Sequence, residues 1–163
     1  KSRDGRPFGN NLYIQGKVWA LRDQMVLKDG ENVPVAVCLR KFELIKQTFK
    51  IYSTRQVYEG QQPSAQKYKD YQLYTYATVE RVPLSTEQRV NLTRGGEYTI
   101  HRAGSWWPKK RVVKRNGRVA ALMEGGTWEG NWNSYLITVN PGIDPCLMVV
   151  LCAVCDEMDE VSD

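Results

Sequence analysis

The sequence predicts a mainly β fold in which a closed antiparallel β-barrel encloses one hydrophobic C-terminal α-helix. The chain holds about ten short segments with strand-like patterns, bounded by turn residues. It also holds one helix candidate, which begins at Asp144 and is apolar on every side. The core of a sandwich is about 10 Å thick and is filled by its own side chains. A barrel of ten or more strands leaves a lumen that a helix can fill, so the barrel is the better solution.

The helix candidate lies in the segment PGIDPCLMVVLCAVCDEM, which begins at Pro141. Asp144 can cap a helix by accepting a hydrogen bond from a free N–H, and Pro145 suits the first helical position. Every residue from Cys146 to Cys155 is apolar, so no side of this helix can lie on water. A buried strand is the alternative for a continuous apolar run, but the length, the cap and the proline favour a helix over about 145–157. The run is shorter than the roughly 20 apolar residues that span a bilayer.

The strand candidates are separated by clear turn signals. The strongest hairpin has Asn116-Gly117 between the segments 112–115 and 118–122, because both turn residues tolerate positive φ. Residues 71–79 alternate between apolar and polar or aromatic side chains, as a half-buried strand does. One long polar loop runs from Glu59 to Asp70, and loops of this length are either functional or mobile.

The predicted organisation is a single domain over residues 11–158, with a flexible arm at 1–10 and an acidic tail at 159–163. The chain of 163 residues carries 23 basic and 18 acidic residues, and five of the acids lie in its last eight positions, where there is no base. The rest of the chain therefore has a net charge of +10. Such a charge favours phosphoinositides, acidic lipid surfaces or nucleic acid as partners, although it also serves solubility alone.

Residues that carry enzymatic chemistry are sparse in this sequence. His101 is the only histidine, and none of the common hydrolase, zinc-protease, P-loop or dinucleotide-binding motifs occurs. The acids of 156–160 lack the spacing of a calcium loop, so we expect a solvated tail that ends the helix. The sequence therefore predicts no enzyme, no cofactor and no metal site. Four cysteines are expected to be small buried side chains in a reducing compartment: Cys38, Cys146, Cys152 and Cys155.

The best candidate binding site is a basic hairpin that also contains tryptophan. Its members are Trp106, Trp107, Lys109, Lys110, Arg111, Lys114, Arg115 and Arg118. Strand alternation sends Lys109, Arg111 and Arg115 to one face, and Lys110 and Lys114 to the other. Tryptophan beside lysine and arginine suits a membrane interface, and it also suits single-stranded nucleic acid. A solvated hairpin with a packed tryptophan is the third interpretation.

Three segments resemble the LURP-one-related family, which shares the Tubby C-terminal-like fold with Tubby domains and phospholipid scramblases. Residues 135–144 and the apolar run after them resemble the family's closing strand, Pro-Gly-x-Asp turn and central helix. Residues 35–52 are similar to its early strands, and residues 118–122 to a late strand. The resemblance implies a barrel around the helix and no established enzymatic activity. Phosphoinositide binding belongs to the Tubby branch of this fold.

Together these observations predict a non-enzymatic module that binds anionic phospholipid, such as a phosphoinositide, or a membrane surface through the basic hairpin. The second hypothesis is a protein-interaction scaffold whose loops, chiefly Glu59–Asp70 and Trp128–Trp132, contact a protein partner. The third is a nucleic-acid-binding module. We expect a cytoplasmic protein, peripheral at a membrane under the first hypothesis and also nuclear under the third.

Overall fold

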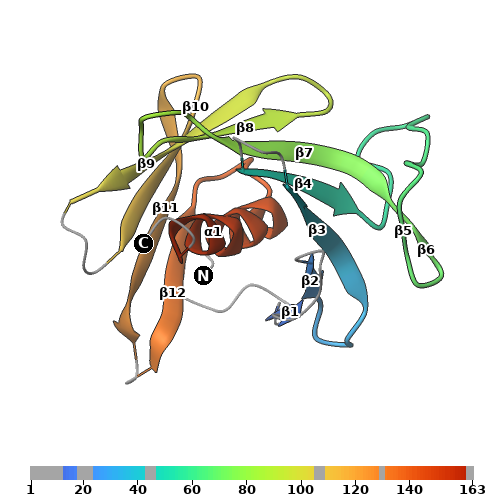
Figure 1. The fold of residues 1–163 in the computed structure, drawn as a ribbon, viewed down its shortest axis with the longest axis horizontal. Helices are drawn as coiled ribbons and strands as arrows, with labels where there is room; N and C mark the ends of the chain where they lie inside the picture. Colours follow the sequence, from blue (N-terminus) through green and yellow to red (C-terminus); the bar gives the residue numbers. More distant parts are fainter. Residues whose placement is uncertain (1–12, 18–23, 43–46, 105–108, 129–130, 161–163) are drawn as a thin grey trace. The chain divides into compact units, whose positions relative to one another are not determined.

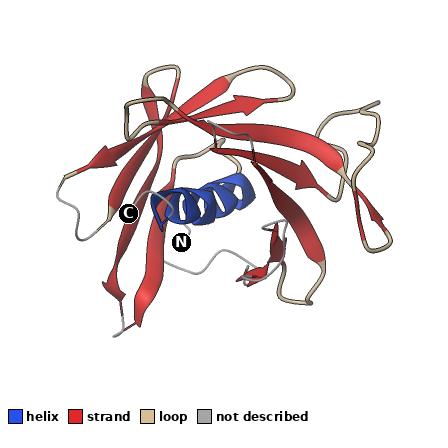
Figure 2. Cartoon of the chain, viewed as in Figure 1, coloured by secondary structure: helices blue, strands red, loops and turns tan. Residues whose placement is uncertain are grey.

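The computed structural model describes residues 13–17, 24–42, 47–104, 109–128 and 131–160. Strands make up most of the described chain, and a single helix follows the last of them (Figures 1 and 2). In chain order the elements are β1 (Tyr13–Lys17), β2 (Gln24–Lys28), β3 (Pro34–Phe42), β4 (Gln47–Ser53), β5 (Lys67–Tyr68), β6 (Tyr71–Gln72), β7 (Tyr74–Arg81), β8 (Gln88–Leu92), β9 (Glu97–Ala103), β10 (Lys110–Arg115), β11 (Arg118–Trp128), β12 (Asn131–Val139) and α1 (Pro145–Glu160).

Ten of these strands form one large antiparallel sheet in the order β1-β2-β3-β4-β7-β8-β9-β10-β11-β12, and β5 pairs with β6 alone. The prediction of a mainly β fold with a C-terminal helix is confirmed. The closed barrel is not, because over the described residues β1 and β12 end the strand order and do not pair with each other. The chain divides into two compact units, Lys1–Thr78 with Leu92–Arg94, and Val79–Asn91 with Gly95–Asp163.

The first unit contains the long polar loop and a small apolar core. In that core Val37 of β3 pairs with Val26 of β2 and with Tyr52 of β4, and Leu73 packs against the same cluster. The loop is anchored through Gln61, which is buried although it is polar. Its side-chain amide donates to the carbonyl oxygen of Thr75 at 2.7 Å, and its side-chain oxygen accepts a hydrogen bond within the loop. The loop therefore has a defined conformation, and its last part forms a short hairpin in which β5 pairs with β6.

The second unit holds the basic hairpin and α1, which packs against β12 (Figure 1). The helix begins as predicted, since Asp144 accepts a hydrogen bond from the N–H of Cys146 at 2.8 Å. It runs on to Glu160, past the predicted end near residue 157. None of its residues from Cys146 to Asp159 is fully exposed. The prediction that no side of the helix lies on water holds only in part, because several of these residues are half-buried.

The helix is nevertheless buried unevenly, which explains why it needs no closed barrel. With about 100° between successive residues, five of the six half-buried residues gather on one face, with Asp159 beside it: Cys146, Val149, Ala153, Asp156 and Glu157. The opposite side carries Leu147, Leu151, Val154 and Met158, which are buried. The apolar run predicted enclosure on all sides, whereas in the structure one face is less buried and carries small and acidic side chains.

Candidate functional site

The predicted basic hairpin is formed by β10 and β11, which pair on either side of Asn116-Gly117. Both turn residues have positive φ, 50° for Asn116 and 76° for Gly117, as the sequence predicted. Arg111 and Val113 are buried, whereas Lys110 between Lys109 and Arg111 is exposed. Strand alternation therefore splits the cations between two faces, as expected, and the two faces have different surroundings.

On the inner face, Arg111 lies beneath the C-terminal end of α1. Its side chain is only 2% exposed, and its Nη2 lies 2.6 Å from Oδ2 of Asp159 and 3.7 Å from Oδ1 of Asp156. The same nitrogen donates to the carbonyl oxygen of Cys155 at 3.3 Å. Lys109, just before β10, donates from Nζ to Oδ1 of Asp156 at 2.9 Å. Two cations of the hairpin are therefore paired with two acids of the helix.

Tyr135 of β12 completes this arrangement. Its hydroxyl donates to Oδ1 of Asp156 at 2.5 Å. Tyr135 pairs across the sheet with Gly125 of β11, and a Cβ on Gly125 would lie 2.8 Å from Cε1 of the tyrosine ring. Glycine is therefore needed at this position so that the ring can lie over the strand and reach the helix. We call Lys109, Arg111, Tyr135, Asp156 and Asp159 the helix-end cluster.

In the helix-end cluster the pKa shifts favour an ionised Asp156, a protonated Tyr135 hydroxyl and a charged Arg111, which are the states that their contacts require. Burial would raise the pKa of Asp156, but hydrogen bonds from Tyr135 and Lys109 and the nearby positive charges lower it overall. Burial, followed by the hydrogen bond to Asp156, raises the pKa of Tyr135, which therefore stays a donor. Burial would lower the pKa of Arg111, but Cys155 and Asp159 outweigh it and raise the pKa. The cluster holds two positive and two negative charges and is suited to joining β10 to α1.

These contacts correct the expectation of a solvated acidic tail. Asp156 and Asp159 lie within the helix and are paired with hairpin cations, so the helix does not end at the first acid. Sequence reasoning missed both acids, together with Tyr135 and Gly125. The available signal was their spacing: Asp156 and Asp159 share one side of a helix, and Lys109 and Arg111 share one face of a strand.

The cations at the turn end of the hairpin have different surroundings from those at its base. We call Lys114, Arg115 and Arg118 the hairpin tip; the two arginines are exposed and Lys114 is half-buried. Among the described residues none of the three forms an ion pair with a carboxylate, and Arg115 lies over the ring of Tyr98, 5.5 Å from its centroid. Lys110, further down the strand, pairs with Glu124 at 2.8 Å.

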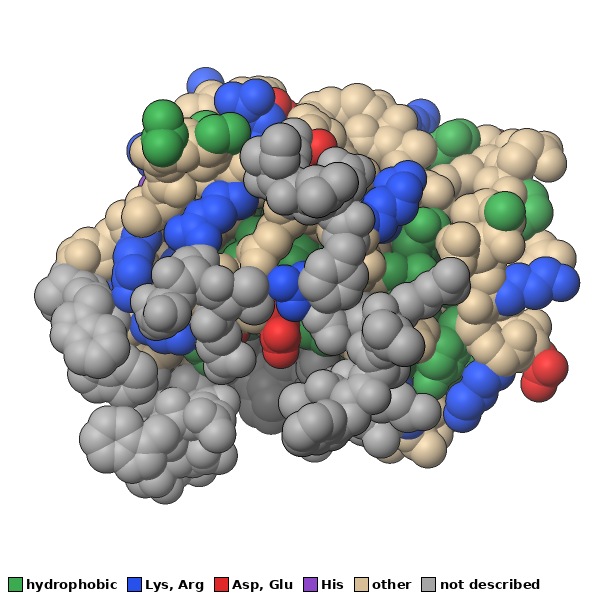
Figure 3. Space-filling model, viewed as in Figure 1, with side chains coloured by type: hydrophobic (Ala, Val, Ile, Leu, Met, Phe, Trp, Pro, Cys, Tyr) green, Lys and Arg blue, Asp and Glu red, His purple; other side chains and the backbone are tan. Residues whose placement is uncertain are grey.

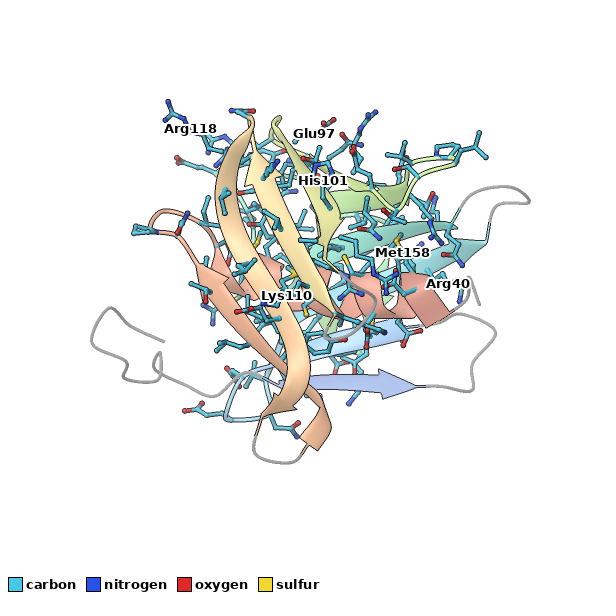
Figure 4. The ribbon with its side chains drawn as sticks, turned by 90° about the vertical axis from the view of Figure 1, so that its left-hand side faces the viewer. Arg40, Glu97, His101, Lys110, Arg118 and Met158 are labelled. Atoms are coloured by element: carbon cyan, nitrogen blue, oxygen red, sulfur yellow. The ribbon has the colours of Figure 1, made fainter. Side chains whose placement is uncertain are left out.

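The figures show where the cations of this region lie. In Figure 3, Lys and Arg side chains gather over the strands β9 to β11. Figure 4 places Arg118 at the turn end of the hairpin and Lys110 nearer its other end. Trp106 and Trp107, which the sequence placed in the site, lie outside the described residues. The side chains of the second tryptophan pair, Trp128 and Trp132, are not described either, so the expectation that their loop contacts a protein partner stays a prediction.

Three of the four cysteines are buried as the sequence predicted, whereas Cys146 is half-buried. None of the four is in a disulfide. Burial raises the pKa of Cys152 and of Cys155 to about 12, so both thiols are protonated at neutral pH. A thiolate is the reactive form of cysteine, and the Cys152-x-x-Cys155 pair is therefore suited to packing.

The described residues contain neither a metal site nor a membrane-spanning helix. There is no group of three or more His, Cys, Asp or Glu side chains placed to hold a metal ion. Within the same part of the chain, no helix combines the length and the apolar character that a membrane span requires.

Comparison with known proteins identifies the family. A family model described as LURP-one-related matches residues 7–156, which is most of the chain. Neither the comparison with curated proteins nor the comparison with solved structures found a match. The matched range includes the hairpin, the Pro-Gly-x-Asp turn and nearly all of the apolar part of α1. This chain belongs to the LURP-one-related family.

Proposed function

We propose that this protein is a non-enzymatic module that binds anionic phospholipid headgroups, of the phosphoinositide type, at a cytoplasmic membrane surface through the hairpin tip. The observation that carries the proposal is the division of cations along one hairpin. Lys109, Lys110 and Arg111 have carboxylate partners, whereas the described surroundings supply none to Lys114, Arg115 and Arg118. Three cations within five positions, left without acids, suit a ligand that carries several negative charges.

The chemistry of the tip fits phosphate. An arginine can donate two parallel hydrogen bonds to phosphate oxygens, and a lysine acts as a point charge beside them. Near an anionic membrane each Lys or Arg contributes about 1 kcal/mol. Removing all three cations should therefore cost about 3 kcal/mol, which corresponds to a loss of about 100-fold in affinity.

The experiment is sedimentation of the protein with vesicles, either of neutral lipid alone or with added phosphoinositide, at low salt and at about 0.15 M salt. The test variant replaces Lys114, Arg115 and Arg118 by alanine. Lys109 and Arg111 are kept, because their loss would disturb the fold as well. A control variant replaces three exposed cations of the other unit by alanine and lowers the net charge equally: Arg55, Lys67 and Lys69.

We expect the wild type and the control variant to bind phosphoinositide vesicles selectively at both salt concentrations, and the tip variant to lose this binding. Urea unfolding of each variant checks that the fold is kept. Equal loss in the test and control variants would mean that net charge alone attracts the vesicles. Absence of selective binding by the wild type would refute the proposal. A single-stranded oligonucleotide that displaces the protein from vesicles would instead favour the nucleic-acid hypothesis.

A protein-interaction scaffold is the second candidate, and one observation favours it. The β5–β6 hairpin projects Tyr71, which is exposed, next to a turn in which Lys69 has a φ of 52°. A lysine in the left-handed region is strained, and such strain is found more often at binding sites than elsewhere. If the wild type binds neither vesicles nor oligonucleotide, a Tyr71→Ala variant compared with the wild type in chemical cross-linking would test this hairpin as a contact.

A further inference from the structure

Val119 is an apolar side chain exposed at the hairpin tip. It is 50% exposed, while the next two residues of β11, Ala120 and Ala121, are buried. It pairs across the hairpin with Lys114 and follows Arg118 directly. A valine in this place therefore presents its methyl groups to the outside between two cations.

A β-bulge lies between Val119 and Ala121. Val113 pairs with Ala121 and Lys114 pairs with Val119, so that Ala120 is an extra residue without a partner on β10. In a regular strand the side chains alternate, and Val119 would then share the buried face of Ala121. One inserted residue reverses the face of every residue before it. Val119 pairs with Lys114 and shares its outer face, and the bulge allows Ala121 to lie on the buried face opposite Val113.

The bulge is held by Asn140, the residue that follows β12. Its backbone N–H donates to the carbonyl oxygen of Ala120 at 2.9 Å. Its side-chain amide donates to the carbonyl oxygen of Val119 at 2.7 Å. The two carbonyl groups displaced from the regular pairing are thus satisfied, and the outward position of Val119 is built into the fold.

We propose that Val119 inserts into the boundary between headgroups and acyl chains when the hairpin tip docks on an anionic bilayer. This inference rests on the proposed function and deepens it, because it names a bilayer surface, and not a free inositol phosphate, as the ligand. A free phosphate gives a valine no apolar surface to bury. A bilayer offers cations the headgroup phosphates and offers an apolar side chain the acyl boundary just beneath them. Val119 and Lys114 lie side by side on the hairpin. The lysine can therefore meet a headgroup phosphate while the valine reaches the acyl boundary beneath it.

The test compares three variants, each checked by urea unfolding. Val119→Ser removes apolar surface, Val119→Leu adds it, and Leu84→Ser is the control. Leu84 is a fully exposed leucine of the same unit, in the turn between β7 and β8 and away from the hairpin tip. Binding is measured to vesicles that contain phosphatidylinositol 4,5-bisphosphate and, in a second arm, to soluble inositol 1,4,5-trisphosphate.

We expect Val119→Ser to weaken vesicle binding about fivefold, which corresponds to about 1 kcal/mol, and Val119→Leu to strengthen it. Binding of the soluble trisphosphate should be the same for all variants, and Leu84→Ser should bind vesicles like the wild type. If Val119→Ser binds vesicles as the wild type does, or loses soluble trisphosphate equally, this inference is wrong while the proposed function stands. If the wild type binds no anionic vesicle, both are wrong.

Discussion

Replacing Arg111 by methionine tests whether the helix-end cluster stabilises the fold. The substitution keeps a long side chain but removes the charge that faces Asp159, whose side chain is 18% exposed. It also removes the donor to the carbonyl oxygen of Cys155. Breaking a buried ion pair by removing one partner costs about 3–5 kcal/mol, because the remaining charge stays uncompensated. Asp159 keeps some contact with water, so we expect a loss of about 3 kcal/mol in the free energy of unfolding.

The same unit offers a matched control in Arg89→Met. Arg89 lies 3.5 Å from Glu97, and their side chains are 48% and 45% exposed. Pairs as exposed as this contribute about 0–1 kcal/mol. Urea unfolding followed by circular dichroism measures both variants. The reasoning is refuted if Arg111→Met costs no more than Arg89→Met.

A double variant distinguishes the contribution of the Arg111–Asp159 ion pair from the cost of leaving one of its charges buried without a partner. Removing both partners, Arg111→Met with Asp159→Leu, leaves no uncompensated charge, and such replacements are often neutral or stabilising. Arg111 also has a second nitrogen, Nη1, that is buried and has no hydrogen-bond partner in the described structure, which limits what the pair contributes. We therefore expect the double variant to be more stable than Arg111→Met alone.

Three further predictions concern single positions in the same unit. Folding lowers the pKa of Asp156, so its contribution is fully present above the unfolded pKa of about 3.9 and is lost as the pH falls through the lower folded value. The difference in urea midpoint between wild type and Asp156→Asn should therefore vanish in acid, and a difference independent of pH would contradict this. Leu84→Gly should stabilise the protein by about 0.5–1 kcal/mol in thermal or urea unfolding, since Leu84 is 109% exposed and has a φ of 58°, where only glycine is unstrained. A loss of stability would count against it. Gly125→Ala should cost about 2 kcal/mol by crowding Tyr135, and the cost should shrink when Tyr135→Ala is also present; an unchanged cost would place the strain elsewhere.

The features that sequence predicted correctly are those with local causes. Asn116-Gly117 forms its turn because two neighbouring residues tolerate positive φ. Asp144 and Pro145 start α1 because capping acts within one helical turn. The alternation of Lys110 and Arg111 follows from the geometry of a strand. None of these features depends on a residue far along the chain.

The end of α1 could not be predicted in this way. Acids in the last turn oppose the helix dipole, an effect of about 0.3–1 kcal/mol, and on that basis the helix was expected to stop earlier. Ion pairs with Lys109 and Arg111 outweigh this effect, but these residues precede Asp156 and Asp159 by more than forty positions. Only the fold brings the two cations of the hairpin next to the two acids of the helix. The closed barrel failed for a related reason, because an apolar run does not reveal how much of each face is covered.

The bulge at Ala120 shows how one residue decides what the hairpin tip presents. The segment Arg118-Val119-Ala120-Ala121 carries no turn signal, and regular alternation would have put Val119 and Ala121 on the same face. Lys109 and Arg111 at the base of the hairpin serve the fold through α1, while the part of the chain that the structure describes gives the tip cations no carboxylate partner. Variants at the two ends should therefore differ in what they change. Arg118→Ala should shift the free energy of unfolding by less than about 0.5 kcal/mol, and it should weaken vesicle binding. Arg111→Met should lower stability, and its folded fraction should bind vesicles as the wild type does. A variant at one end that changed both properties equally would mean that the hairpin works as one unit.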